Sequence, residues 1–435
     1  MLYNATVILY TIQCNKLFIV GDFMAIFKAF KAFRPSKENQ SLIPELPYDV
    51  MSSDEARDMV KGNDLSFLHV DKAEIDLDKN VDLYSKAVYE KAKENLLNLE
   101  NSGALIQDDK PCLYIYKQVM NGNSQVGLVG CASIDDYKNN IIKKHENTLA
   151  KKEQDRINHV NTCDANTGPI FLTYRKNNDV CEIINEWMNN NEPVYDFEKA
   201  DTQHTIWVVD ENTAVEKLQN LFATIPAMYI ADGHHRCASA VKVGDMRRHE
   251  NPNYDGSEEF NYFLAVAFPD EELKIMDYNR VVKDLNGYSF DEFVDKISDK
   301  FDVISCDGQC KPKEKHTFGM YYDNNWYLLK AKTGTFDEND SVARLDVSIL
   351  QENLLDSVLG IKDPKNDDRI DFIGGIRGLD ELEKRVNDDM IIAFAMYPTS
   401  IDDLMSIADD GKIMPPKSTW FEPKLLSGLF IHHLS

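Results

Sequence analysis

The sequence of 435 residues predicts a mixed α/β (α+β) fold in which a larger region is followed by a small α+β lobe. Apolar strand patterns alternate with amphipathic helix patterns along most of the chain. Residues 112–120 and 125–134 read as two strands joined by Asn121-Gly122, a strong hairpin signal. A helix pattern and two strand patterns within residues 289–335 predict the separate lobe. This mixture favours sheets covered by helices.

The order of patterns divides the chain into four segments. We expect residues 1–23 to be an optional or spurious extension, because polar residues interrupt their apolar runs and Met24 opens an ordinary start. That extension is too short and broken for a membrane span and lacks the features of a signal peptide. Residues 24–288 are expected to form the catalytic region, 289–335 the small lobe, and 336–435 a region that returns to the active site.

Periodicity also predicts the individual elements. Ser52 or Ser53 is a plausible N-cap for a helix that follows a proline-braced loop. Other helices are expected over 81–103, 180–190, 213–222, 345–359 and 400–411. Strands are expected from residue 24 to Pro35, at the start of 66–76, and over 166–175, 204–210, 261–269 and 390–398.

Composition limits the possible partners. The net charge of −25 opposes binding to nucleic acid and to anionic membranes, so we expect neither partner. An anionic small substrate would need a local cationic pocket or a metal ion. The eight cysteines are scattered without a C-x-x-C pair, which is typical of free thiols in a reducing cytosol and predicts a cytoplasmic protein.

Residues 227–244 concentrate more chemistry than any other stretch. An apolar strand over 227–230 leads into a turn at Asp232-Gly233 and a helix that begins near His234, followed by His235 and Arg236. Glycine allows close approach of the backbone, and a helix N-terminus offers free N–H groups to an anion. The pattern favours a functional anion site over a strand-to-helix turn with an Asp cap and solvated histidines.

A second polar cluster covers residues 141–160. Lys144, His145, Glu146 and Arg156 combine cations with acid–base groups. On a helix, Lys152 and Arg156 share a face. A solvated helix face would have a similar composition, so both interpretations stay open.

Residues 412–431 contain a third candidate. Lys417, Ser418 and Thr419 supply one cation and two hydroxyls at adjacent positions, and Lys424 follows. The G-x-x-x-x-G-K pattern is absent and Pro416 precedes the lysine, so this segment is no nucleotide P-loop. It is a candidate anion clamp, with a surface turn ahead of an edge strand as the alternative.

Phosphoryl transfer suits these residues best, because it depends on cations, N–H donors, Mg²⁺ and one base. Adjacent histidines point about 100° apart on a helix, which disfavours a metal site at His234-His235. No G-x-S-x-G motif is present, and Cys237 is expected to be packed inside the helix. Asp232 or Glu146 could hold Mg²⁺ or deprotonate an attacking hydroxyl.

Six segments together carry a family resemblance. They are PYDV, SFLHVDKAEID, KKHE…DRINHV, NTGPIF, IADGHHR and MPPKSTWFEPKLLSGLF, in matching order from Met24 to the C-terminus. The chain resembles a large family long labelled as a domain of unknown function, distantly similar to the ParB/sulfiredoxin superfamily and its free-serine kinases. The resemblance implies a ParB/sulfiredoxin-like core with added strands and helices. It also implies a pyrophosphate-dependent serine kinase that makes O-phospho-L-serine and feeds serine and cysteine metabolism.

The resemblance also implies roles for single residues. The D-G-H-x-R element would bind the phosphoryl donor, and an acidic residue after an N-terminal strand, here Glu38, would serve as base. The expected catalytic residues are Asp232, His234, His235 and Glu146; the expected phosphate-binding residues are Gly233, Arg236, Lys417, Ser418, Thr419, Lys144 and Arg156; and the expected substrate-binding residues are His145, Glu74, Arg34 and Glu38.

Mg²⁺ is the expected cofactor, held by Asp232, by Glu146 or through the donor phosphates. L-serine and pyrophosphate are the expected small-molecule partners, and a homo-oligomer is possible. Three alternatives stay open: an ATP- or ADP-dependent small-molecule kinase, a ParB-like nucleotide- or nucleic-acid-binding protein, and a metabolite-binding protein without catalysis.

Overall fold

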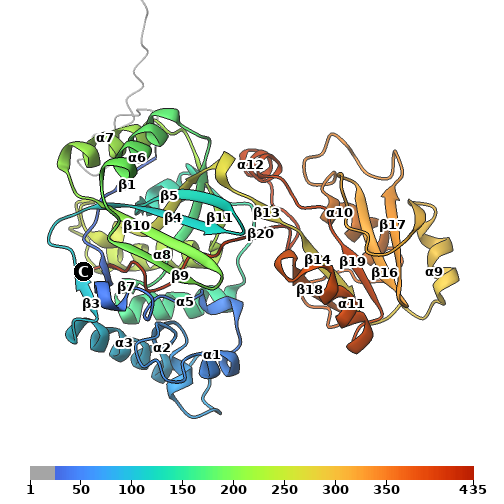
Figure 1. Cartoon of the computed structure of the whole chain (residues 1–435), viewed down its shortest axis with the longest axis horizontal. Helices are drawn as coiled ribbons and strands as arrows, with labels where there is room; N and C mark the ends of the chain where they lie inside the picture. The colour runs from blue at the N-terminus through green and yellow to red at the C-terminus, as the bar shows by residue number, and fades with distance from the viewer. Residues whose placement is uncertain (1–24) are drawn as a thin grey trace, which may run out of the picture.

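A nine-stranded mixed sheet forms the centre of the larger of two lobes (Figure 1). The computed structural model describes residues 25–435, so the predicted extension over 1–23 lies outside the described residues. Two strand pairs are parallel, β11 with β6 and β12 with β8. The strand order is β6 (Ile142–Lys143), β11 (Met228–Asp232), β8 (Ile170–Tyr174), β12 (Tyr262–Pro269), β5 (Asn123–Ser133), β4 (Leu113–Met120), β10 (Thr202–Val209) and β9 (Tyr195–Lys199), and β1 (Phe27–Lys28) pairs with β5.

Helices cover this sheet on both sides. In Figure 1, α6 and α7 lie at one end of the larger lobe, and α1, α2 and α3 lie at the opposite end. The helices of this lobe are α1 (Ser53–Met59), α2 (Leu68–Asp71), α3 (Lys86–Asn101), α4 (Ile134–Lys138), α5 (Ala150–Cys163), α6 (Asn178–Asn190), α7 (Asn212–Phe222) and α8 (His234–Glu250). Two short ladders close the lobe, β2 (Phe33–Pro35) with β3 (Leu105–Gln107) and β7 (Ala165–Asn166) with β21 (His432–His433).

The smaller lobe is built on a six-stranded antiparallel sheet. Its order is β15 (Phe301–Cys306), β17 (Asn325–Ala331), β16 (Thr317–Tyr322), β19 (Ile392–Ala395), β14 (Tyr278–Val282) and β18 (Ile370–Gly374). Its helices are α9 (Phe290–Ile297), α10 (Asp346–Leu350), which continues as a π-helix over Gln351–Asp356, and α11 (Gly378–Asp388). The sheet takes strands from both sides of the segment 289–335 in which the sequence predicted a lobe.

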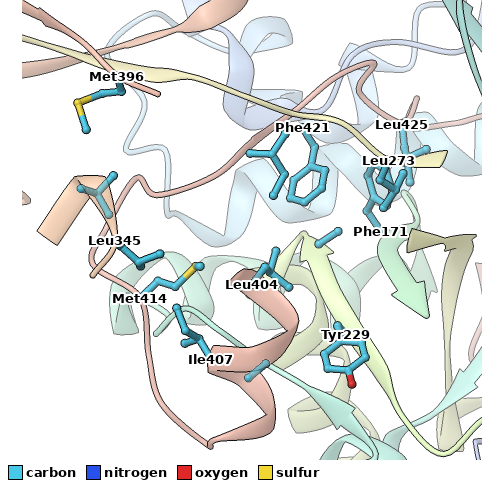
Figure 2. Packing of buried hydrophobic residues seen from close by; sticks show 14 of the residues in the cluster. Phe171, Tyr229, Leu273, Leu345, Met396, Leu404, Ile407, Met414, Phe421 and Leu425 are labelled. Atoms are coloured by element: carbon cyan, nitrogen blue, oxygen red, sulfur yellow. The ribbon is translucent and has the colours of Figure 1, made fainter. Parts of the chain in front are cut away.

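One hydrophobic core continues from the larger lobe into the smaller one. Phe171 and Tyr229 of the larger sheet pack in the same cluster as Leu404 of α12 (Ile401–Asp409) and Leu345 beside α10 (Figure 2). The returning chain forms β20 (Trp420–Phe421), which pairs with β13 (Ile275–Met276). This pairing therefore fixes β20 where the lobes meet.

The mixed α/β fold predicted from the sequence is confirmed. The hairpin turn has positive φ at both Asn121 (50°) and Gly122 (76°), as a tight two-residue turn requires. Ser52 is the N-cap of α1, in a capping box with Glu55. No helix within residues 25–435 is long and apolar enough to cross a bilayer.

Two predicted strands are wrong in detail. The stretch at 66–76 is helical instead, because the Ser66 hydroxyl accepts a hydrogen bond from the N–H of Leu68, and Phe67 and Val70, three residues apart, are both buried. The first predicted strand is divided into β1 and β2, which pair with different partners. A short apolar run does not distinguish a strand from a buried helical turn.

Candidate active site

Gly233 forms the turn between β11 and α8. Its φ of 89° and ψ of 30° are left-handed, and a Cβ there would lie 3.2 Å from Nε of Arg236, so the position requires glycine. Among residues 25–435, no side chain caps the first turn of α8. The N–H groups of that turn are thus available to an anion, as the sequence predicted for this stretch.

A pocket of about 170 Å³ opens at this turn. Four basic and three acidic side chains line it, so a net positive site lies in a chain of net charge −25. The basic residues are Lys152, Arg236, Lys417 and Lys424, and the acidic residues are Asp49, Glu146 and Asp232. The other polar and aromatic lining residues are Tyr48, His234, His235, Tyr278, Thr419, Trp420 and Phe421. The structure therefore brings the DGHHR turn, Glu146 and the PPKST segment together.

Asp232 is held in an ion pair. The Lys424 ammonium lies 3.0 Å from its Oδ2, and Oδ1 accepts a 2.8 Å hydrogen bond from the N–H of Gly233. Burial opposes ionisation of this carboxyl, but Lys424 and Arg236 outweigh burial and hold its pKa well below the ordinary value. Asp232 is thus a fixed anion that positions Lys424, and its carboxylate is not a free base.

The two histidines of the turn are neutral side chains. The rings of His234 and His145 meet edge to face at 4.5 Å, and Nε2 of His234 is buried without a hydrogen-bond partner among residues 25–435. Burial lowers the pKa of His145 to about 4 and that of His234 well below its ordinary value. Nε2 of His235 accepts a 3.0 Å hydrogen bond from the N–H of Leu149, and burial lowers the pKa of this ring too. These rings supply no positive charge at neutral pH.

Arg236 faces both the pocket and a small cavity behind it. Its Nη1 donates a 2.7 Å hydrogen bond to the carbonyl of Pro169. Arg156 lines the cavity behind but not the pocket, and its guanidinium lies 4.0 Å above the ring of Tyr48 and pairs with Asp155 at 2.8 Å. The Tyr48 side chain lines both spaces.

The PPKST segment contributes two of its three predicted residues. Lys417 has a φ of 59°, and its ammonium lies 5.4 Å from the centre of the Tyr278 ring. Thr419 also lines the pocket, with Oγ1 3.5 Å from Nε2 of His145. The Ser418 hydroxyl instead donates a 2.6 Å hydrogen bond to the carbonyl of Pro415. Ser418 therefore shapes the turn from outside the pocket lining.

Glu146 is the acid–base candidate of the pocket. Burial raises the pKa of this carboxyl, and Lys417 partly offsets the rise. A raised pKa brings a carboxyl nearer to the range in which it can exchange a proton at neutral pH. Within the part of the chain that the structure describes, no group of three or more His, Cys, Asp or Glu side chains is arranged to hold a metal ion.

Seven predicted site residues are not part of the pocket lining: Ser418, Arg156, His145, Lys144, Glu74, Arg34 and Glu38. Lys144 is exposed, 5.9 Å from the centre of the Tyr137 ring. Glu74 binds Ser53 and Lys72, and Arg34 binds Asp108 through two nitrogens, so both side chains are engaged elsewhere. Glu38 lies exposed in a 3₁₀ turn. The acidic residue that the resemblance implied as base is therefore not in this pocket.

Sequence reasoning gave no role to eight lining residues, and five of these have polar side chains. Tyr48 and Asp49 stand in the PYDV segment, whose place in the ordered set of segments was the available signal. Lys152 lies one helical turn before Arg156, and this spacing predicted a shared helix face but no role for Lys152. No local pattern marks Tyr278 or Trp420, because their positions depend on how the lobes meet.

The family described as "Protein of unknown function (DUF1015)" matches residues 27–348. No curated protein matches the chain. A solved free serine kinase in complex with AMP is 12% identical, over 68% of this chain and 86% of that chain, with a TM-score of 0.36.

Two further solved structures have comparable scores. A conserved hypothetical protein from Pyrococcus furiosus is 14% identical, over 69% of this chain and 92% of that chain, with a TM-score of 0.33. SbnI with a C-terminal truncation, from Staphylococcus aureus, is 10% identical, over 69% and 85%, with a TM-score of 0.36. Scores of this size assign no activity to the present chain.

Proposed function

Because the chain belongs to the DUF1015 family of proteins of unknown function, its activity must be argued from its site, and we propose that it is a phosphotransferase. The reaction transfers a phosphoryl group from pyrophosphate to the hydroxyl of free L-serine and yields O-phospho-L-serine and phosphate. One observation supports this most strongly: four basic side chains surround the uncapped N-terminus of α8 in a single pocket. The family resemblance of the sequence supplies the acceptor and the donor.

The covered aromatic rings favour a compact donor. Ammonium groups lie over Trp420 (Lys424, 4.6 Å) and over Tyr278 (Lys417), and the guanidinium of Arg156 lies over Tyr48. Gly374 also packs on the indole, since a Cβ there would lie 2.8 Å from Cε2 of Trp420. Each ring therefore has one face occupied by protein, which reduces the aromatic surface on which an adenine could stack.

The proposed transfer is in line. The serine oxygen forms a new bond to phosphorus while the bond from phosphorus to the bridging oxygen breaks, and phosphate leaves with that electron pair. Arg236, Lys417 and the amides of α8 stabilise the charge on the phosphoryl oxygens. Glu146 accepts the proton of the serine hydroxyl, for which its raised pKa suits it.

Mg²⁺ supplies charge neutralisation in this proposal. Asp232 already pairs with Lys424 and Glu146 serves as the base, so the ion would be held through the donor phosphates. The enzyme is proposed to act in the cytoplasm, where its product would feed serine and cysteine metabolism.

The direct experiment incubates the purified full chain with L-serine, Mg²⁺ and one donor at a time. Pyrophosphate, ATP and ADP are compared by ³¹P NMR, which resolves O-phosphoserine from phosphate. We expect phosphoserine with pyrophosphate. Product with a nucleotide alone would refute the pyrophosphate donor, and no product with any donor would refute the kinase. Saturable ligand binding without turnover would instead favour a metabolite-binding protein.

A further inference from the structure

A second polar cavity, of about 330 Å³, lies where the smaller lobe meets α12. Figure 1 places α10 and α12 near the junction of the lobes. The titratable residues that line this cavity are Lys315, His316, Arg344, Asp346 and Asp403. The proposed phosphotransfer uses none of these residues.

Asp346 is the unusual group of this cavity. Only 7% of its surface is exposed, yet its Oδ2 has no hydrogen-bond partner within residues 25–435. Its Oδ1 accepts a 2.9 Å hydrogen bond from the N–H of His316. Burial raises the pKa of this carboxyl to about 7. A buried carboxyl oxygen without a partner is costly, and a ligand cation would remove that cost.

The cations of the cavity are only partly neutralised. Lys315 and Arg344 share one carboxylate, Asp403, at 2.6 Å and 3.8 Å. Asp403 also accepts the N-cap hydrogen bonds of Ser400, so its capacity is divided among several donors. The Arg344 side chain is thus loosely held and 40% exposed, and its guanidinium can form a two-pronged contact with a ligand carboxylate.

We propose that this cavity binds a free α-amino acid with an apolar side chain. The ligand ammonium would bind the Asp346 carboxyl group, and the ligand carboxylate would bind Arg344. Leu345, Tyr397 and Pro398 also line the cavity and would contact the apolar side chain. The two charges of the ligand match the one free acidic oxygen and the one loosely held cation.

A single hydrogen bond connects this cavity to the catalytic pocket. Thr399, a lining residue of the cavity, donates through Oγ1 to the carbonyl of Ser418 at 2.9 Å. Ser418 stands between Lys417 and Thr419, which both line the catalytic pocket. The proposed amino acid is therefore an effector whose binding shifts the PPKST segment. The binding itself does not depend on the proposed phosphotransfer.

The test is calorimetric titration of the full chain with L-valine, which has no hydroxyl to phosphorylate. Isobutylamine and isobutyrate serve as probes that lack one of the two charges. We expect saturable 1:1 binding of L-valine and no measurable binding of either single-charge probe. Asp346→Asn and Arg344→Gln should each weaken the binding of L-valine about tenfold or more. Lys144→Met, at an exposed lysine that lines neither site, should leave it unchanged.

The connection is read from the fluorescence of Trp420, which lines the catalytic pocket. Saturating L-valine should change an emission component that Trp420→Phe removes, and Thr399→Val should abolish the change while L-valine still binds. Failure of L-valine to bind, equal binding of isobutyrate, or binding that survives both cavity variants would overturn the site. Binding without the Trp420 signal would overturn the effector role. Neither result depends on phosphoserine formation, so failure of this effector site can be told apart from failure of the kinase proposal.

Discussion

The ammonium of Lys424 lies 3.0 Å from Oδ2 of Asp232, and this ion pair joins the C-terminal segment to the start of α8 across 192 residues of sequence. Lys424 is largely buried, whereas the Asp232 side chain keeps 34% of its surface exposed toward the pocket. The pair therefore does two things. It forms part of the pocket wall, and it keeps the Asp232 carboxyl ionised but unavailable as a base.

Lys424→Met should reduce the free energy of unfolding by about 1–3 kcal/mol, because it leaves the Asp232 carboxylate without its partner but partly hydrated. The folded pKa of Asp232 lies below its unfolded value of about 3.9, so the pair stabilises the protein above that pH. The difference between wild type and variant should shrink as the pH falls below about 4. Urea unfolding from pH 3 to 7 measures it. Lys144→Met, at an exposed lysine, is the control, and an equal loss in both variants would contradict this role.

His145→Gln should flatten the dependence of stability on pH. The folded pKa of His145 is about 4 against an unfolded value of about 6.5, so between these values only the unfolded chain binds the proton. Stability of the wild type should therefore rise with pH in this interval, by up to about 1.4 kcal/mol per pH unit for this ring. Urea unfolding at pH 4.5, 5.5 and 6.5 measures the slope. The same slope in wild type and variant would contradict the lowered pKa, because it would show that His145 takes up its proton equally in the folded and unfolded chain.

Glu146→Gln should lower kcat by about 10²-fold or more, as expected for removal of a general base. Donor affinity should stay the same or increase, because the variant removes a negative charge beside Lys417. In the wild type, kcat should fall as the pH decreases through the raised pKa of Glu146. Initial rates of phosphoserine formation and calorimetric Kd values for pyrophosphate separate the two effects. A lower affinity with unchanged kcat would assign Glu146 to binding.

Ser418→Ala and Thr419→Val should have different effects, although the residues are adjacent. The first removes the hydrogen bond to Pro415 and should cost about 0.5–1.5 kcal/mol of stability without changing the Kd for pyrophosphate. The second alters the pocket lining and should weaken pyrophosphate binding several-fold. Weaker pyrophosphate binding in Ser418→Ala alone would contradict the turn geometry described above.

Much of the local structure could be predicted from the sequence. The strand, Gly233 turn and helix at 228–250 follow from an apolar run and one glycine, and the hairpin follows from Asn121-Gly122. Four residues of the pocket were predicted as site residues from their type and sequence context: Asp232, Arg236, Glu146 and Lys417. Such features depend on neighbours in sequence, where propensity and turn chemistry act.

The rest depends on contacts between distant segments. Nothing in the sequence around Arg34 shows that Asp108 binds its guanidinium, and nothing around Ser418 shows that its hydroxyl points to Pro415. Tyr278 and Trp420 reach the pocket because β13 and β20 pair between the lobes. The order of the smaller sheet also could not be predicted, since β14, β18 and β19 come from outside the segment 289–335.

The most direct test compares pyrophosphate binding and phosphoserine formation in the wild type, Lys417→Met and Lys144→Met. Lys417 lines the pocket, whereas the exposed Lys144 lies outside it. We predict that wild type and Lys144→Met bind pyrophosphate equally and make phosphoserine at similar rates, whereas Lys417→Met weakens binding about tenfold or more and makes correspondingly less product. Equal binding and equal rates in all three proteins would contradict the claim that this pocket holds the phosphoryl donor.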